Sequence, residues 1–265
     1  MISLGVNTVL FKAYSFAEAA RAIKLAGYDG LEISAIKGMC EHLDPLAYKG
    51  QKQGILDALE ETGLKMLSTE VASLDEERLK WAFEAAAEIG IPVINVGPGG
   101  KSGDEATLKE SIATLIKLSE LAESFGVTLC CKAHVGAAIY NTPTTLAAMA
   151  QISSSGFGID MDPSHIFRAG ENPEEALPAV LSRTRHVHIR DCRGRGPAPG
   201  EPALQACGRG DIDLYGYFAA MVSGGYDGPV CLEVIGPELD MVHATAIASE
   251  SYGYMNACLK KLGAR

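Results

Sequence analysis

The sequence predicts an α/β protein whose single domain, residues 1–265, is a (β/α)8 TIM barrel. Short apolar runs alternate with longer helical segments along the whole chain, and alternating βα units imply parallel strands. Several helix-to-strand junctions place a glycine just before an aliphatic run, as in A-G-Y-D-G-L-E-I and S-F-G-V-T-L. A length of 265 residues also fits one closed barrel of about 250 residues.

A doubly wound sheet that binds a dinucleotide is the rival fold. The segment C-G-R-G-D-I-D contains G-x-G, but it lacks the third glycine and does not follow a clean strand–turn–helix pattern. The closed barrel is therefore the better prediction.

The expected strands are aliphatic or β-branched runs bounded by turn residues. They are Ser3–Asn7, Asp29–Ile33, Lys65–Glu70, Pro92–Val96, Thr128–His134, Gly158–Asp162, His186–Arg190 and Pro229–Val234.

Helical patterns lie between these runs. Ser15–Ala26 begins with a serine that is followed three residues later by a glutamate, which is a capping box. Leu74–Ile89 has acidic residues in its first turn, where the helix dipole favours negative charge. Glu105–Phe125 carries an apolar stripe at helical spacing and is followed by a glycine. The last two expected helices are Asp211–Met221 and Val242–Leu262.

Composition narrows the class of partner and the compartment. The net charge is −10 and no basic run is present, so the chain lacks the electrostatic pattern of a nucleic-acid or anionic-membrane binder. The seven cysteines form no C-x-x-C pair, which favours reduced thiols over a disulfide framework. The first residues do not resemble a secretory signal, and no apolar run approaches the ~20 residues of a membrane helix. We therefore expect a cytoplasmic protein.

Four runs in the second half end in groups that bind metals or move protons: Val127–His134, Phe157–His165, His186–Asp191 and Val230–Val234. Active sites of such barrels lie at the carboxyl ends of the strands, so these groups are expected to converge. One such residue alone is usually an ordinary polar side chain, but four correlated strand ends favour a site. The candidates are Lys132, His134, Asp162, His165, His186, His188, Asp191 and Glu233.

These candidates include carboxylates and imidazoles that suit Mn, Mg, Zn, Co or Fe(II). His186 is the weaker member, because the beginning of a strand can be exposed to solvent. Cys130, Cys131 and Cys231 are expected to pack as small core residues.

The segment Cys192–Gly210 is rich in glycine and proline and long for a βα loop, so we expect a lid over the site. Its residues Arg193 and Arg195, with Arg209, could clamp a phosphate or could simply be solvated.

The motifs D-P-S-H, H-V-H-I-R-D, G-R-G-D-I-D and L-E-V, together with the overall pattern, resemble one known family across essentially the whole chain. It is the sugar phosphate isomerase/epimerase group of the xylose isomerase-like TIM barrels, which includes tagatose 3-epimerases, inosose isomerases and inosose dehydratases. Members usually bind one Mn or related ion through a Glu, an Asp, a His and a second Glu.

The resemblance implies a role for each matching position. Asp162, His188 and Glu233 match the last three metal ligands, while His134 and His165 match substrate-contacting histidines. The first metal-binding Glu of the family is replaced by Lys132.

This replacement leaves three alternatives. A metal could bind through the remaining three ligands with Lys132 as acid/base, which we rank first. The Lys132 ammonium could instead replace the ion and pair with Asp162 and Glu233. A neutral Lys132, its pKa lowered by burial and a nearby cation, could act as base, ligand or Schiff-base amine.

The resemblance implies an enzyme that moves a proton α to a carbonyl on a sugar, ketose or cyclitol through an enediolate. Lys132 and Glu233 would exchange the proton, and His134, His165, Asp191 and Arg193 would hold the substrate. The expected partner is a small carbohydrate, and a homo-oligomer is possible. The alternatives are a lyase or dehydratase at the same site, or a sugar-binding barrel without catalysis.

Overall fold

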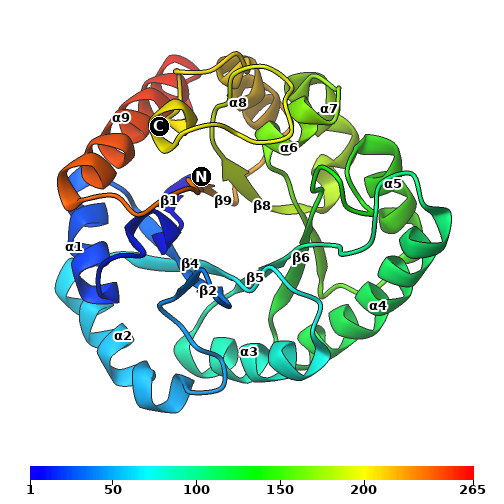
Figure 1. Cartoon of the computed structure of the whole chain (residues 1–265), viewed down its shortest axis with the longest axis horizontal. Helices are drawn as coiled ribbons and strands as arrows, with labels where there is room; N and C mark the ends of the chain where they lie inside the picture. The colour runs from blue at the N-terminus through cyan, green and yellow to red at the C-terminus, as the bar shows by residue number, and fades with distance from the viewer.

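The computed structural model describes all residues from Met1 to Arg265, and they form a ring of strands surrounded by helices (Figure 1). Every strand pairs in parallel with its neighbours except β3, a short antiparallel extension of β2. The strands are β1 (Ser3–Val6), β2 (Gly30–Ile36), β3 (Cys40–Glu41), β4 (Lys65–Glu70), β5 (Val93–Val96), β6 (Thr128–Lys132), β7 (Phe157–Asp160), β8 (Thr184–Ile189) and β9 (Pro229–Leu232).

The barrel closes between β1 and β2. Along the sheet the order is β1-β9-β8-β7-β6-β5-β4-β2-β3, which leaves β1 and β2 to meet. A single parallel bridge joins Asn7 to Glu32, and the backbone N–H of Asp29 donates to the carbonyl of Leu4 at 3.0 Å. Side chains from the first strands therefore face the same interior as those from the last.

The outer ring consists of α-helices and three short 3-10 helices. They are η1 (Thr8–Phe11), α1 (Phe16–Ala26), α2 (Tyr48–Thr62), α3 (Glu76–Ile89), α4 (Glu105–Ser124), α5 (Thr142–Gln151), α6 (Pro163–Arg168), α7 (Pro173–Val180), η2 (Leu181–Arg183), η3 (Pro202–Gln205), α8 (Leu214–Ser223) and α9 (Met241–Lys261).

The signals that end and begin these helices are local. Ser15 and Glu18 form the capping box of α1, and Asp75 caps α3 by accepting from the backbone N–H of Arg78. Gly27 ends α1 with a φ of 102°, a left-handed conformation that glycine adopts without steric cost. The chain can then turn directly into the next strand.

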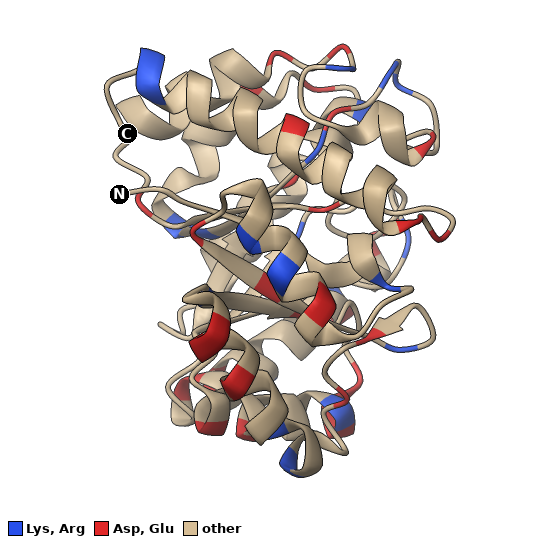
Figure 2. Cartoon of the chain, turned by 90° about the vertical axis from the view of Figure 1, so that its left-hand side faces the viewer, with Lys and Arg blue, Asp and Glu red and all other residues tan.

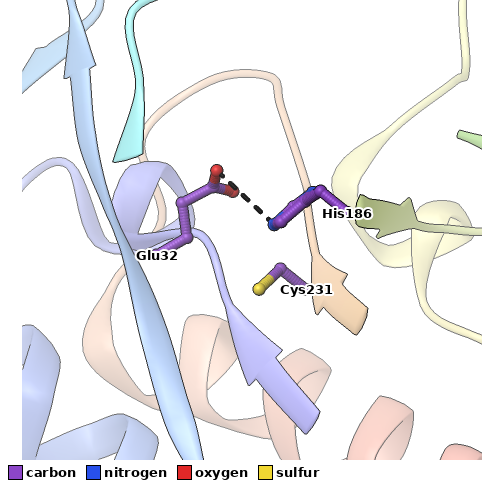
Figure 3. A group of neighbouring side chains, drawn as sticks. All are labelled: Glu32, His186 and Cys231. Carbon is purple, nitrogen blue, oxygen red and sulfur yellow. Dashed lines mark ion pairs between the residues drawn. The ribbon is translucent and has the colours of Figure 1, made fainter. Parts of the chain in front are cut away.

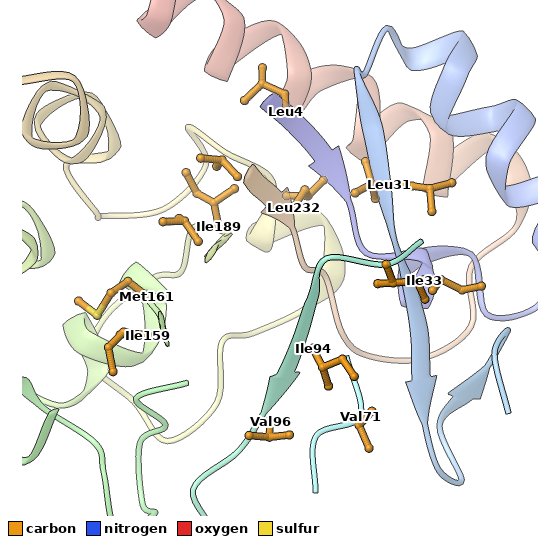
Figure 4. Close-up of a cluster of buried hydrophobic side chains, with 14 of the residues drawn as sticks. Leu4, Leu31, Ile33, Val71, Ile94, Val96, Ile159, Met161, Ile189 and Leu232 are labelled. Carbon is orange, nitrogen blue, oxygen red and sulfur yellow. The ribbon is translucent and has the colours of Figure 1, made fainter. Parts of the chain in front are cut away.

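The barrel wall separates apolar from polar side chains. Alternate residues of each strand point outward into a cluster of 65 buried hydrophobic residues, and Figure 4 shows Leu4, Ile33, Ile94 and Leu232 among them. The residues between them point into the barrel, and many are polar. The buried polar residues of the strands are Glu32, Ser34, Ser68, Thr69, Glu70, Asn95, Lys132, Asp160, Thr184, His186 and His188, and buried Asn7 directly follows β1.

Charged residues are interspersed on the outer helices and loops, without a continuous basic stripe on the side shown in Figure 2. None of the helices combines the length and apolar character that crossing a membrane requires.

The expected strands all occur, but β6, β7 and β9 end two residues earlier than expected. Asp162 accepts a hydrogen bond from the backbone N–H of Ser164 at 2.8 Å and caps α6, whose first residue is Pro163. This turn into a helix ends the strand before Asp162.

The expected helices correspond to α1, α3, α4, α8 and α9, whereas α2, α5, α6 and α7 were not expected. In α2 the reason is visible in the sequence. The helix has no side-chain cap, and Gly50 and Gly54 lie in its first half, so its local signal is weak.

Candidate acid–base site

The interior of the barrel holds two groups of charged side chains. The first, the inner cluster, comprises Glu32, Asp160, His186 and His188, all fully buried. The second, the cavity cluster, comprises Glu70, Lys132, Asp162, Arg190 and Glu233, which are at most 4% exposed. Both groups follow from strand alternation, because successive inward positions of one strand lie two residues apart.

Asp160 holds the inner cluster together. One carboxylate oxygen lies 3.0 Å from His186 Nδ1, and the other contacts His188 Nδ1. The Nε2 atom of His188 contacts Glu32, so this imidazole lies between two carboxylates. Burial lowers the pKa of His188, but Asp160 and Glu32 outweigh burial and hold the pKa well above its usual range. His188 is therefore an imidazolium in a buried ion pair.

His186 is completely buried, which corrects the expectation that it is exposed to solvent. Its Nε2 atom lies 2.9 Å from Ser68 Oγ and 3.8 Å from Glu32 Oε1. Figure 3 shows Glu32, His186 and Cys231 converging from β2, β8 and β9. Cys130, Cys131 and Cys231 are all buried free cysteines, as expected.

Lys132 lies at the centre of the cavity cluster. Its ammonium donates to Glu70 Oε1 at 2.8 Å and to Glu233 Oε1 at 2.9 Å. Burial lowers the pKa of Lys132, but the two glutamates outweigh burial and hold the pKa well above its usual range. The resting lysine is therefore protonated, which does not favour the alternative of a neutral amine.

Arg190 provides the second cation of this cluster. Its guanidinium nitrogens lie 2.9 Å from Asp162 Oδ2 and 3.1 Å from Glu233 Oε2, and its Nε donates to Ser164 Oγ at 2.8 Å. The contacts with the two carboxylates are ion pairs without hydrogen-bond alignment. As a result, Asp162 Oδ2, Glu233 Oε2 and Arg190 Nη1 are buried polar atoms without a hydrogen-bond partner.

The two glutamates differ in protonation. Burial, and then the negative charge of Glu233, raise the pKa of Glu70 to about 8. Burial also raises the pKa of Glu233, but Lys132 and Arg190 outweigh it and hold the pKa well below its usual range. Near neutral pH the site therefore presents a protonated Glu70 and an ionised Glu233, and carboxyl groups with divergent pKa values are typical of acid–base sites.

A cavity of about 150 Å³ opens onto this cluster. Its lining includes four members of the cavity cluster, all except Asp162, and both predicted substrate-contacting histidines. The lining residues are Ile36, Met39, Glu70, Ala72, Gly97, Lys132, His134, His165, Arg190, Glu233 and Ile235.

His165 is surrounded by hydrogen-bond donors. Arg168 Nη2 lies 3.0 Å from its Nδ1, and Arg190 Nη2 lies 2.8 Å from its Nε2. Burial, and then the charge of Arg190, hold the pKa of His165 well below its usual range, so the ring is neutral. A neutral imidazole accepts at only one nitrogen, so only one of the two arginines can donate a hydrogen bond to the His165 ring. The ring centroid of His134 lies 4.0 Å from that of His165.

Asp191 and Arg193 do not line the cavity. The carboxylate of Asp191 accepts from the backbone N–H groups of Cys192 at 2.9 Å, Gly208 at 3.0 Å and Ile212 at 3.2 Å. Arg193 is exposed and donates to the carbonyl of Arg209 at 3.1 Å. Asp191 thus fastens both ends of the long loop in the structure.

The expected lid, Cys192–Gly210, supplies none of the cavity's lining residues. Arg195 donates to the carbonyls of Phe167 and Glu171 instead, at 2.5 and 2.8 Å. The cavity is lined instead by Ile36, the last residue of β2, and by Met39, which lies between β2 and β3.

Side chains that could together bind a metal ion do occur in the barrel. Ligand atoms lie within 4.8 Å of one another in three sets: Glu32, His186 and Cys231; Asp160, His186 and His188; and Glu32, Glu70 and His188.

The ligand set implied by the resemblance is arranged differently. Asp162 and Glu233 flank Arg190, whereas His188 contacts Asp160 and Glu32. A divalent ion between Asp162 and Glu233 would lie beside two positive side chains, which would repel it. The cavity cluster, as arranged, does not fit a divalent ion, and Asp162, His188 and Glu233 remain predicted ligands only.

Sequence reasoning missed four members of the site: Glu32, Glu70, Asp160 and Arg190. Asp160 lies inside the expected strand Gly158–Asp162 but was not singled out. Glu32 and Glu70 lie in the expected strands of the first half, and Glu70 ends its strand just as Glu233 follows β9. The rule that identified Glu233 could therefore have identified Glu70. Arg190 was noted only as part of H-V-H-I-R-D, although it shares an inward face with His186 and His188.

The fold and site define a class of protein: a parallel α/β barrel with buried acids and bases at the carboxyl ends of its strands. Residues 20–258 match the family described as xylose isomerase-like TIM barrel. The chain belongs to this family.

Curated relatives match only part of the chain. The chain is 26% identical to inosose dehydratase from Clostridium botulinum over 133 residues, which is 45% of this chain and 44% of that protein. It is 32% identical to inosose dehydratase from Clostridium beijerinckii over 79 residues, 30% of this chain and 26% of that protein. The match thus spans less than half the length of these curated relatives.

Solved structures share the fold over nearly the whole chain. The probable 3-DHS dehydratase of Bacillus anthracis superposes with a TM-score of 0.78 at 16% identity, covering 96% of this chain and 98% of that one. For the 3-keto-D-glucoside 4-epimerase of E. coli the TM-score is 0.76 at 19% identity, with 97% and 100% covered. For the D-allulose 3-epimerase of Methylomonas sp. it is 0.74 at 19% identity, with 97% and 98% covered. At such identities the likeness shows the fold.

Proposed function

We propose that this protein is an enzyme that moves a proton at the carbon next to a carbonyl group of a sugar, ketose or cyclitol. The observation that carries the proposal is the Lys132 ammonium held between Glu70 and Glu233, at 2.8 and 2.9 Å, in the lining of a cavity. A cation flanked by two carboxyl groups supplies charge stabilisation and two sites for proton transfer in one place.

The proposed roles follow from protonation. Glu233 is ionised and takes the proton from the carbon, and the electron pair of that C–H bond moves onto the carbonyl oxygen to form an enediolate. Lys132 stabilises this oxygen with its ammonium. When the substrate oxygen draws the N–H donors of Lys132 and Arg190 away from Glu233, the carboxylate loses stabilisation and becomes a stronger base. Glu70 is protonated near neutral pH and returns a proton.

Where the proton returns decides the reaction. Return to the neighbouring carbon, together with transfer of the hydroxyl proton to the former carbonyl oxygen, gives isomerisation. Return to the opposite face of the same carbon gives epimerisation. His134 and His165 line the cavity and are proposed to hold substrate hydroxyls. Asp191 and Arg193 were also expected to hold the substrate, but neither lines the cavity. Their proposed role is in the loop beside the site.

A dehydratase is the second candidate, and the protonated Glu70 favours it. Elimination needs an acid that protonates the leaving hydroxyl, so that water departs as the enediolate collapses to the unsaturated product. The matched relatives from Clostridium are inosose dehydratases, which is consistent with this outcome.

The remaining proposals come from the sequence and the resemblance: a small carbohydrate as partner, a cytoplasmic location and a possible homo-oligomer. For the cofactor, the sequence allows either a divalent metal or a site where Lys132 replaces it. The arrangement of the cavity cluster supports the second.

Solvent exchange tests the proposal. The purified protein is incubated in D2O with a panel of ketoses, aldoses and inososes, and the substrates are followed by NMR. We expect deuterium at a carbon next to the carbonyl of at least one compound, and a new unsaturated carbonyl absorbance if water is eliminated. Saturable binding of a panel member without exchange or product would identify a sugar-binding barrel and contradict the proposal.

A further inference from the structure

We infer that Lys132 and Arg190 together take the place of a divalent metal ion and bind the oxygen atoms of an α-hydroxycarbonyl compound. This inference rests on the proposed function for its substrate class, but its statement about the metal stands independently of activity.

The first support is the position of the two cations. Lys132 contacts Glu70 and Glu233, and Arg190 contacts Asp162 and Glu233. Each carboxyl group that could ligate an ion in this cluster is therefore already in contact with a positive side chain. Glu233 contacts both cations, one at each carboxylate oxygen.

The second support is the balance of charge. Lys132 and Arg190 contribute two positive charges, and Asp162 and Glu233 contribute two negative charges. Glu70, Asp162 and Glu233 each lie within ion-pair distance of at least one of these two cations. An added divalent cation would therefore lie beside both positive side chains in a buried space, which is strongly unfavourable.

The third support is a set of unpaired atoms that points to a ligand. Arg190 Nη1 lies 3.1 Å from Glu233 Oε2, and Arg190 Nη2 lies 2.9 Å from Asp162 Oδ2, but neither contact is aligned as a hydrogen bond. Arg190 Nη1, Glu233 Oε2 and Asp162 Oδ2 are therefore buried polar atoms without an aligned hydrogen-bond partner. Buried polar groups of this kind are costly unless a ligand or water satisfies them. Arg190 and Glu233 both line the cavity, so a ligand there lies beside the two residues that carry these atoms.

These atoms specify the chemistry of the ligand. A carbonyl oxygen accepts hydrogen bonds from Lys132 and Arg190, and an adjacent hydroxyl donates to a carboxylate oxygen of Glu233, all three of which line the cavity. An α-hydroxycarbonyl compound carries an acceptor and a donor on neighbouring carbons, as this pattern requires. A metal ion would use only the acceptors and would leave Arg190 Nη1 unsatisfied.

The test begins with the metal alone. Protein purified without chelator is analysed for Mn, Co, Zn, Fe and Mg by mass spectrometry, and its melting temperature is followed during titration with MnCl2. We expect far less than one ion per chain and no shift of the melting temperature with Mn. Deuterium exchange into the active panel compound should survive exhaustive treatment with EDTA.

A variant makes the test specific to the position of Lys132. Lys132→Glu places a carboxylate where the ammonium lies, and we expect its melting temperature to rise with MnCl2, because a ligand that binds the folded state stabilises it. Lys132→Met is the matched control, since it removes the charge without adding a ligand, and should not respond to Mn.

A stoichiometric ion in the wild-type protein would overturn the inference. So would a folded Lys132→Glu variant whose melting temperature ignores Mn. Because metal content and melting temperature need no substrate, they report on the inference even if the exchange assay refutes the proposed function.

Discussion

The ammonium group of Lys132 donates a hydrogen bond to Glu70 at 2.8 Å, although the two residues lie 62 positions apart in the chain. Parallel strands make this contact possible, because β4 and β6 both end at the same rim of the barrel. The pair places a permanent cation beside a carboxyl group whose pKa is raised to about 8, mainly by burial. Proton transfer and charge stabilisation are thereby brought to one point.

Replacing Lys132 is expected to abolish most of the exchange activity. Lys132→Met removes the cation that stabilises the enediolate oxygen, and we expect the rate of deuterium exchange to fall roughly 10²–10⁴-fold. NMR exchange rates at saturating substrate, on protein whose folding is checked by circular dichroism, measure the effect.

Lys132→Arg is the matched control, because it keeps the charge. We expect little recovery, since a planar guanidinium is larger than an ammonium and presents its N–H groups in a fixed fork. Full exchange activity in folded Lys132→Met would instead show that the lysine is structural and that Arg190 with Glu233 suffices.

Glu70 should set the alkaline limit of activity. Its carboxyl group carries the proton to be returned, and its pKa is raised to about 8, so kcat/KM is expected to fall as pH rises above about 8. In Glu70→Gln this limb should disappear, and the rate at neutral pH should be roughly 10²–10⁴-fold lower. A pH–rate profile of both proteins decides, and an unchanged alkaline limb in Glu70→Gln would exclude Glu70 as its source.

The same group should appear in the stability of the protein. In the folded state the pKa of Glu70 rises from its ordinary 4.5 to about 8, so between these pH values the folded protein holds a proton that the unfolded chain releases. The free energy of unfolding should therefore decrease as pH rises through this window, by up to about 1.4 kcal/mol per pH unit for one proton. Urea unfolding at several pH values measures this slope. The Glu70→Gln variant should lack this component, and an equal slope in both proteins would contradict the assignment.

Much of the barrel could be predicted from the sequence because its signals are local. Gly27 ends a helix and Ser15 caps one whether or not the rest of the fold is known. Strand alternation likewise predicts that Lys132 faces inward. The helix α2 could not be predicted in this way, because two glycines and a missing cap weaken its local signal, and packing between α1 and α3 stabilises it instead.

The site was predicted less completely, for a physical reason. Which strand ends carry polar residues is visible in the sequence, but the partners of long side chains depend on their neighbours across the barrel. His188 and Asp162 both face inward, yet His188 pairs with Asp160 and Glu32, while Asp162 pairs with Arg190. Spacing along one strand does not determine such contacts between strands.

The inner cluster should contribute strongly to stability. Asp160→Asn keeps an oxygen for the backbone N–H of His188 but removes the charge that balances its imidazolium. Breaking a buried ion pair at one partner costs about 3–5 kcal/mol, which urea unfolding should detect. Asp240→Asn is the matched control, since exposed Asp240 also contacts a histidine, His243, and asparagine retains its helix cap, so no measurable change is expected.

The pH dependence of this effect has a defined sign. Burial raises the pKa of Asp160, but His188 and His186 outweigh burial and hold the pKa well below 3.8. The contribution of Asp160 to stability is therefore present above pH 3.8 and is lost as pH falls through the lowered pKa. The pKa of His188 is raised above 6.5, so its contribution is complete below that pH and is lost as pH rises through the raised pKa. The full difference between wild type and Asp160→Asn is therefore expected between pH 3.8 and 6.5. A variant as stable as the wild type in this window would show that His188 is neutral.

Asp191 should control the mobility of the loop that follows β8. Its carboxylate accepts from the backbone N–H groups of Cys192, Gly208 and Ile212, so Asp191→Ala leaves these amides without their acceptor. The loss of hydrogen bonds to a charged group costs about 1–3 kcal/mol, and amide exchange in the loop should accelerate roughly 5- to 150-fold. Hydrogen–deuterium exchange measured by mass spectrometry on peptides from residues 192–212 tests this. Asp211→Ala is the matched control, because Asp211 accepts only from the backbone N–H of Gly194 in the same loop, and its effect should be smaller and local. If both variants exchange like the wild type while Asp191→Ala raises KM for the active compound, Asp191 binds substrate directly, as the resemblance implied, and does not fasten the loop.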